Sequence, residues 1–258
     1  MKGTSFLPIS AKEVEERGWA EVDFVYVCGD AYVDHPSFGA AIITRVLEEQ
    51  GFNVAFLSQP KFHNPEDFKR FGKPRLGFLV SAGNIDSMVA HYTVAKRKRN
   101  YDYYSPGGKP GLRPDRATDI YCRLIREAYP DTAIIIGGLE ASLRRFAHYD
   151  YWDDKIRRSV LFDSQADLLI YGMGENQIIE IADRLNAGES VSDMRDIRGT
   201  CYTCDVRETP LTGAECPSFE KVSENKKDYA LYMIWLPSFL LGLRLLQLLS
   251  LSSSQKRD

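Results

Sequence analysis

Asp34 and His35 place a carboxylate beside an imidazole, directly after an apolar run that ends near Asp30. A histidine can ligate a metal or move a proton near neutral pH, and an aspartate can cap a helix or hold a cofactor. The following Pro36 and Gly39 open an apolar helical pattern, so the pair lies at a strand-to-helix turn. The residues alone leave three roles open: catalysis, binding, or shaping the loop.

A second group of chemically capable side chains lies between residues 140 and 154, which are too polar to form a core. Arginines next to carboxylates could bind an anionic substrate through paired hydrogen bonds, and a histidine could transfer a proton. The alternative is an ion-paired loop that docks onto another domain. The candidate residues here are Glu140, Arg144, Arg145 and His148.

A third group combines four consecutive cations, residues 96–99, with Tyr101, Tyr103 and Tyr104. Basic residues interleaved with aromatic ones can hold phosphates and stack bases, so this segment is a candidate for RNA binding. A solvated loop is the alternative. The formal net charge of −3 gives no global field that would favour nucleic acid. The RNA-binding hypothesis therefore depends on this local cluster alone.

The five cysteines are too few for a disulfide scaffold in 258 residues. We interpret Cys28 and Cys122 as buried thiols in a reducing, cytoplasmic setting, because no secretory leader is visible at the start of the sequence. Cys201, Cys204 and Cys216 lie three and twelve residues apart. We favour a chance grouping, with a zinc site that recruits a fourth ligand as the alternative.

Five short apolar runs predict β-strands, and helical periodicity fills the intervals between them. Ile42, Ile43, Val46 and Leu47 are predicted to share the buried face of a first helix that ends at Gly51. Strands that alternate with helices predict an α/β fold with a five-stranded, mainly parallel sheet of cobalamin-binding-like or flavodoxin-like (Rossmann-like) order and helices on both faces. The predicted strands are residues 23–28, 52–57, 76–80, 132–136 and 167–171.

Ligands of such sheets bind beyond the carboxyl ends of the strands, so we expect the loops at those ends to converge on one polar mouth. Most of these loops contain glycine, which lets the backbone approach a ligand closely. No loop carries the full dinucleotide fingerprint, which argues against a classical NAD site. The candidate ligand or docking residues are Asp30, Asp34, His35, Ser81, Asn84, Gly137, Gly138, Gly172, Gly174 and Glu175.

Three long stretches closely resemble the N-terminal domain of YgiQ-type radical SAM proteins. They are "DHPSFGAAIITRVLEEQGFNVAF", "YDYYSPGGKPGLRPDRATDIYCRLIR" and "IIIGGLEASLRRFAHYDYWDDKIRRSVLFDSQADLLIYGMGE". The resemblance extends from about Phe6 to Tyr229. It implies a cobalamin-binding-like α/β domain that precedes a radical SAM domain. Cobalamin-binding domains use D-x-H-x-x-G at the first turn, whereas Asp34 and His35 are adjacent here, so cobalt ligation by His35 is the weakest of its possible roles.

The resemblance also implies that the second domain of the full-length relative holds a [4Fe–4S] cluster through C-x3-C-x2-C and cleaves S-adenosylmethionine. That motif is absent from this sequence. We therefore expect neither cluster nor S-adenosylmethionine in this chain, and we expect this piece alone to be inactive.

The predicted domains are residues 1–229, the radical SAM N-terminal domain, and residues 230–258, an aberrant apolar tail. We attribute the tail to a shifted reading frame or to disorder, because its character changes abruptly. Pro237 and Arg244 argue against a membrane-spanning helix, since a charge in mid-membrane is costly.

The functional hypothesis from the sequence is an accessory domain that shapes substrate access and docks onto a radical SAM core absent from this chain. The expected partners are that missing domain and an unidentified small-molecule or macromolecular substrate, with no membrane. A stand-alone binding module for an anionic or nucleotide-like ligand is one alternative, and an RNA-binding module is the other.

Overall fold

The computed structural model describes residues 6–205, 214–239 and 245–246. It divides the chain into two compact units, which are taken one at a time below. The first unit contains residues 1–145 and 160–202, and the second contains residues 146–159 and 203–258.

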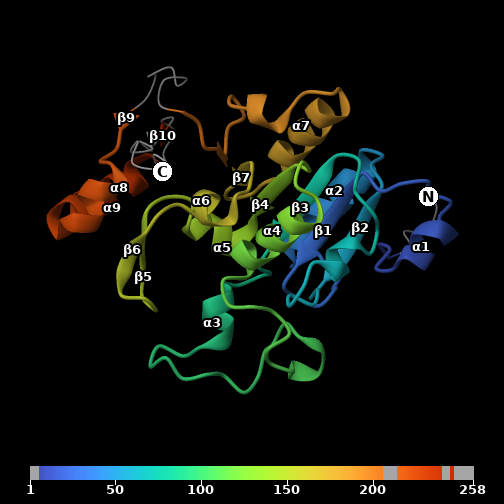
Figure 1. Ribbon diagram of the computed structural model, residues 1–258, viewed down its shortest axis with the longest axis horizontal. Helices are drawn as coiled ribbons and strands as arrows, with labels where there is room; N and C mark the ends of the chain where they lie inside the picture. Colours follow the sequence, from blue (N-terminus) through green and yellow to red (C-terminus); the bar gives the residue numbers. More distant parts are fainter. Residues whose placement is uncertain (1–5, 206–213, 240–244, 247–258) are drawn as a thin grey trace, which may run out of the picture. The chain divides into compact units, whose positions relative to one another are not determined.

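The first unit is built on a six-stranded sheet with the order β2-β1-β3-β4-β7-β8 (Figure 1). The first five strands in this order are parallel, and they are the five strands predicted from the sequence. Their order is flavodoxin-like, which confirms the predicted fold class. The sixth strand, β8, pairs antiparallel with β7 and was not predicted, because two residues carry no periodicity. The strands are β1 (Phe24–Cys28), β2 (Val54–Ser58), β3 (Gly77–Ser81), β4 (Ile134–Gly137), β7 (Leu168–Ile170) and β8 (Thr200–Cys201).

Helices cover both faces of this sheet, and alternate strand residues belong to two separate cores. On one face Tyr26 and Leu79 pack with α2 (Gly39–Glu49) and α7 (Glu175–Asn186). On the other face Val27 and Val80 pack with a second group of helices. Because both faces are covered, the strands read as continuous apolar runs. The helices of the second face are η1 (Glu66–Lys69), α4 (Ala117–Ala128), α5 (Gly138–Leu143) and α6 (Val160–Ser164).

The predicted buried face of α2 is only partly right. The buried residues are Ala41, Thr44 and Leu47, whereas Ile43 and Val46 are half-buried. The Thr44 hydroxyl donates to the carbonyl of Ala40 at 2.8 Å, so its polar group is satisfied inside the helix. A threonine can therefore occupy the buried stripe, which rotates the helix relative to the simple apolar pattern.

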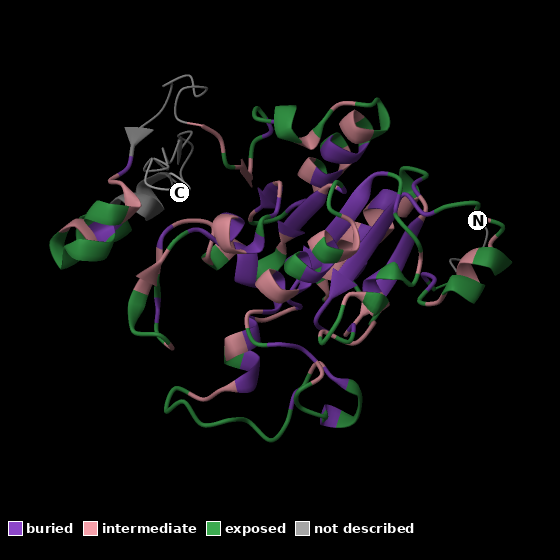
Figure 2. Cartoon of the chain, in the orientation of Figure 1, coloured by how far each residue is buried: buried purple, intermediate pink, exposed green. Residues whose placement is uncertain are grey.

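A long excursion joins β3 to α4, and it contains α3 (Ser87–His91) and the short helix η2 (Pro106–Gly108). Figure 1 shows it as a green segment that projects from the sheet, and Figure 2 shows that most of its outer part is exposed. Two more short elements complete the first unit. They are α1 (Ala11–Glu16), which begins with a capping box, and η3 (Val191–Asp193).

The described residues of the second unit form an antiparallel hairpin, a short parallel strand pair and two helices, with a small core around Val222 and Tyr232. Helix α9 continues across the predicted boundary at residue 230, and residues 240–244 and 247–258 of the predicted tail lie outside the described part of the chain. Within the described residues, no helix has the length and apolarity needed to cross a membrane. The elements are β5 (His148–Asp150), β6 (Lys155–Arg157), β9 (Ala214–Glu215), α8 (Phe219–Glu224), α9 (Lys226–Phe239) and β10 (Leu245–Leu246).

Candidate functional site

The carboxyl ends of the central strands lie level with one another, because Cys28 of β1 is in register with Ser81 of β3, and Ser81 with Gly137 of β4. A cavity of about 370 Å³ opens at this edge of the sheet, next to the first turns of α2 and α7. The structure thus brings together seven of the predicted residues around one space. They are Ser81, Asn84, Gly137, Gly138, Gly172, Gly174 and Glu175.

The interior of this cavity is mainly apolar, so the expectation of a polar mouth was wrong. Strand residues such as Tyr26, Leu79, Ile135 and Ile170 line it together with Ile178 of α7. These strand residues belong to the core on the α2–α7 face, so the cavity continues into that layer instead of staying among the loop tips. Within the described part of the chain, Glu175 alone among the residues that line it carries a charge.

Gly138 closes the turn from β4 into α5 and has a φ of +81°, which L side chains rarely adopt. A Cβ at this position would lie 2.6 Å from Oγ of Ser81, which is closer than such atoms approach. The glycine therefore serves the backbone geometry and the close packing of β3 against the turn, and it leaves the cavity wall made of main chain.

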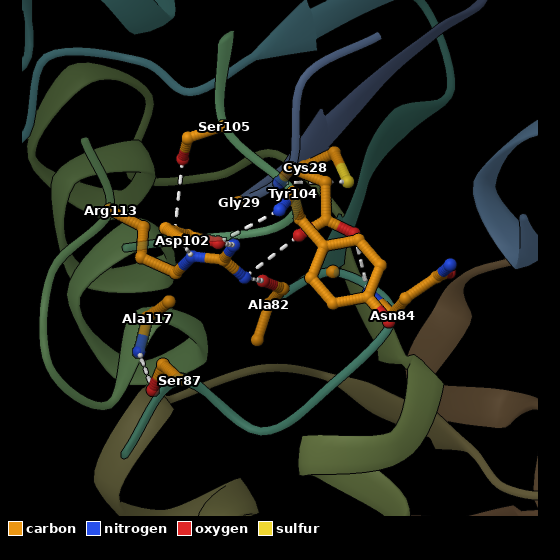
Figure 3. Close-up of polar contacts among 12 residues, drawn as sticks. Cys28, Gly29, Ala82, Asn84, Ser87, Asp102, Tyr104, Ser105, Arg113 and Ala117 are labelled. Carbon is orange, nitrogen blue, oxygen red and sulfur yellow. Dashed lines mark hydrogen bonds and ion pairs between the residues drawn. The ribbon is translucent and has the colours of Figure 1, made fainter. Parts of the chain in front are cut away.

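A buried ion cluster joins the β3–α4 excursion to the residues that follow β1 and β3, and Figure 3 shows its polar contacts. The Arg113 guanidinium is 1% exposed and lies 2.8 Å from the Asp30 carboxylate and 2.9 Å from that of Asp102. It also donates to the carbonyl of Ala82 at 3.2 Å, and Asp102 accepts from Ser105 at 3.0 Å. These contacts tie the β3–α4 excursion to the ends of β1 and β3.

Asp30 connects this cluster to the cavity, because its Oδ2 accepts from the backbone N–H of Asn84 at 2.7 Å. Burial raises the pKa of Asp30 above its ordinary value, and the Arg113 guanidinium opposes this rise. A Cβ on Gly83 would collide with the Asp30 carboxylate, at 2.1 Å. Burial also raises the pKa of the neighbouring Cys28 thiol to about 12, so this cysteine stays protonated and unreactive.

Arg113 and Asp102 were missed at the sequence level. Both lie in a long polar stretch between predicted elements, where charged residues are usually solvated. Nothing in a single sequence distinguishes a buried loop charge from an exposed one, since the difference comes from the strand ends that the loop covers.

Asp34 and His35 do not line the cavity. Asp34 forms an ion pair with Arg45 of α2, whose Nε donates to it at 3.1 Å, and this hydrogen bond lowers the pKa of Asp34. His35 is exposed, and its Nδ1 accepts from the backbone N–H of Ser37 at 3.1 Å. Each residue thus bonds to the turn or to the helix that follows it, which matches the loop-shaping role.

Glu140 is 2% exposed and also lies outside the cavity lining. Its carboxylate accepts from the Ser87 backbone N–H at 2.8 Å, from the Ser87 hydroxyl at 2.6 Å and from the Thr118 N–H at 3.0 Å. These bonds join the first turns of α3, α4 and α5. A carboxylate that satisfies backbone donors in this way holds helices in place.

Arg144 and Arg145 are bound to groups of the protein itself. Arg144 forms an ion pair with Asp86, which caps α3. Arg145 lies over the ring of Tyr171, with 5.0 Å between the guanidinium carbon and the ring centroid. An anionic substrate would have to compete with these contacts.

His148 belongs to the second unit, where its Nδ1 lies 3.1 Å from the carbonyl oxygen of Phe146. In the same hairpin, the Asp150 carboxylate accepts from the backbone N–H groups of Trp152 and Asp153 at 2.8 and 3.1 Å. The hairpin thus uses its polar groups to form its own turn.

The sequence profile of the radical SAM N-terminal family matches residues 6–236. The chain belongs to the radical SAM N-terminal family. It is 57% identical over 230 residues to a UPF0313 protein of Clostridium botulinum, and 56% identical over 231 residues to one of Clostridium perfringens. Both alignments cover 89% of this chain, but only 36% and 35% of the relatives. The chain therefore spans about a third of the length of the curated relatives that it matches.

A solved structure that resembles this radical SAM N-terminal chain is the radical S-adenosylmethionine methyltransferase TsrM from Kitasatospora setae. The sequences are 18% identical, and the TM-score is 0.44. The match covers 70% of this chain and 28% of the methyltransferase chain.

The family name implies an iron–sulfur cluster, but the described cysteines do not fit one. Cys28 and Cys122 are buried in different cores of the first unit, and burial raises the pKa of both thiols. Cys201 lies in β8, and burial raises the pKa of its thiol and of the Cys216 thiol as well. In the part of the chain that the structure describes, no three histidine, cysteine or acidic residues form a group that could hold a metal.

Proposed function

We propose that this chain is the accessory N-terminal domain of a larger radical SAM protein. The longer relatives would carry a radical SAM domain in the part that this chain does not span. The accessory domain docks onto that radical SAM domain and shapes the access of a substrate to it. The cluster and S-adenosylmethionine belong to that second domain. Family membership and the coverage of about a third of each relative support this assignment.

The observation that carries the proposal is the position of the cavity. In open parallel sheets, ligands bind outside the carboxyl ends of the strands, where the strand order reverses. Here the order reverses between β1 and β3, and the cavity is lined by Cys28 of β1 and Ser81 of β3. The fold thus offers a preformed space at the place where this architecture receives ligands.

The lining of the cavity indicates the chemistry of its ligand. Most of its side chains are aliphatic or aromatic, and the polar groups are few, as is usual for small-molecule sites. Because Glu175 is the only charged residue among the described residues that line it, the cavity suits an uncharged or cationic ligand with an apolar part. An anionic or nucleotide-like ligand has less support, since Arg144 and Arg145 are engaged elsewhere and neither lines the cavity.

The cavity can be tested with Nile red, an uncharged apolar dye whose fluorescence rises in apolar surroundings. Ala40 lines the cavity in the first turn of α2 and is half-buried, so Ala40→Trp would fill the space with little change to the core. We expect the affinity of this variant for the dye to be at least about tenfold lower than that of the unchanged chain. Ala11→Trp, at an exposed position of α1, is the matched control and should bind normally. Equal binding by all three proteins would contradict a ligand cavity.

Docking can be tested by hydrogen–deuterium exchange. The isolated chain is compared with the corresponding third of the full-length Clostridium botulinum relative. We expect one contiguous surface of the domain to exchange more slowly in the longer protein, because a packed partner removes that surface from water. Identical exchange in both proteins would rule out a docked domain.

A further inference from the structure

The outer part of the β3–α4 excursion, residues 92–109, forms a distinct surface that is called the basic–aromatic loop here. It contains five cationic residues and a single carboxylate, Asp102. Asp102 is 3% exposed and bound to Arg113, so it does not neutralise the surface. Residues 96–99, all cationic, are exposed. A concentrated positive patch therefore projects from a chain whose formal net charge is −3.

The backbone of the basic–aromatic loop is held in a defined turn. The N–H of Thr93 donates to the carbonyl of Arg97 at 2.8 Å, and the N–H of Lys96 donates to that of Thr93 at 2.9 Å. Next to the turn, Asp115 bonds to Nδ1 of His91 at 2.6 Å. The turn and this anchor order the backbone that carries the cations, which lowers the entropic cost of presenting them to a partner.

Two tyrosines follow these cations closely in the sequence, and their rings are exposed to water. Tyr103 is 85% exposed and Tyr101 is 52% exposed, and their centroids are 4.9 Å apart in an edge-to-face arrangement. The Tyr101 ring packs against Gly108, where a Cβ would come within 1.9 Å of the ring. This contact orients the pair, and the exposed ring faces remain open to stacking.

We propose that the basic–aromatic loop binds single-stranded nucleic acid. Its cations would contact phosphates, and the Tyr101–Tyr103 pair would stack on unpaired bases, which duplexes do not present. An acidic protein could pair with the cations but would leave the aromatic rings without a specific role. The inference is independent of the cavity, because no residue of the loop is among those that line it.

The test is fluorescence anisotropy of the full chain with labelled single strands of twelve nucleotides, oligouridine and oligothymidine, and with a duplex of the same length. We expect both single strands to bind, more tightly than the duplex, with an affinity that falls as salt rises. Tyr103→Ala should weaken binding by about fivefold or more through lost stacking, while Tyr103→Phe, which keeps the ring, should bind normally. Binding of only one of the two single strands would show which nucleic acid the loop prefers and would still support the proposal.

The double variant Arg97→Gln/Lys98→Gln tests the contribution of charge separately. Each lost phosphate contact should reduce the slope of log affinity against log salt by about 0.7, so the two losses together should reduce it by about 1.4. Lys61→Gln/Lys73→Gln is the matched control, since it removes two exposed cations elsewhere on the same unit and should keep the original slope. Three results would each overturn the proposal. The first is no binding at low salt, and the second is an equal effect of the two double variants. The third is displacement of the strand by polyglutamate to the same extent from the unchanged chain and from Tyr103→Ala.

Discussion

Replacing Arg113 by methionine removes the only cation that the structure places between Asp30 and Asp102 among the described residues. The volume of the side chain is largely kept, but two buried carboxylates lose their counter-charge. All three residues are at most 3% exposed, so water cannot replace the guanidinium without opening the loop. Arg113→Met therefore separates the electrostatic role of the residue from its role in packing.

Breaking a buried ion pair by removing one partner costs about 3–5 kcal/mol, because it leaves an uncompensated charge. With a urea dependence of about 2 kcal/mol per molar, the unfolding midpoint should fall by roughly 1.5–2.5 M. The loss should also depend on pH. Burial already raises the pKa of Asp30 in the folded chain, and losing Arg113 removes the opposing effect. A carboxyl group whose pKa is raised in the folded state destabilises the protein once the pH rises above its pKa in the unfolded state, about 3.9. The loss of unfolding free energy caused by Arg113→Met should therefore be smaller near pH 4 and larger near pH 7.

Urea unfolding followed by circular dichroism at both pH values measures this effect. Lys12→Met is the control, because it breaks the exposed pair with Glu16 and should cost less than about 1 kcal/mol at either pH. Adding Asp30→Asn and Asp102→Asn to Arg113→Met should recover part of the loss, since the unpaired charges are then removed. A deficit below about 1 kcal/mol, or one that is equal at both pH values, would refute the reasoning.

Two further predictions concern the turns and the thiols. Gly138→Ala should lower the melting temperature by more than Gly172→Ala does. Both glycines have a positive φ, but only a Cβ at Gly138 would meet a neighbouring side chain. Equal losses would show that crowding at Gly138 is unimportant. In native protein at about pH 8, alkylation followed by mass spectrometry should leave Cys28 and Cys122 unmodified, because burial raises both pKa values, that of Cys28 to about 12, and keeps the thiols protonated. Labelling of either residue before unfolding would contradict this.

Much of the fold could be predicted because its signals are local. Apolar residues recur at helical spacing between Ala117 and Ala128, and the structure has helix α4 over this stretch. The five parallel strands follow from short apolar runs between glycine-containing turns. Strand β8 could not be predicted, since its two residues become a strand only by pairing with Leu169 and Ile170. The buried face of α2 was misjudged because Thr44 satisfies its hydroxyl within the helix.

The edge of the sheet at which the loops gather could be predicted, but the apolar character of the cavity there could not. Seven predicted residues meet at the cavity, because parallel strands bring their carboxyl ends to one edge. The predicted polarity failed, since the space extends under α2 and α7 into the apolar layer. Asp34, His35 and Glu140 are equally polar in the sequence, yet none of them lines the cavity.

The sequence by itself determined the order of strands and helices along the chain, the parallel sheet and the edge at which the loops would gather. These features follow from the spacing of apolar residues and from glycines at turns, which are signals that extend over only a few residues. Only the tertiary structure decided that Arg113 and Asp102 are buried, that the cavity is apolar, and that Arg144 is committed to Asp86. The environment of a charged side chain is set by residues distant in the sequence that cover it, and the cost of burying that charge depends on this environment rather than on its neighbours in the chain.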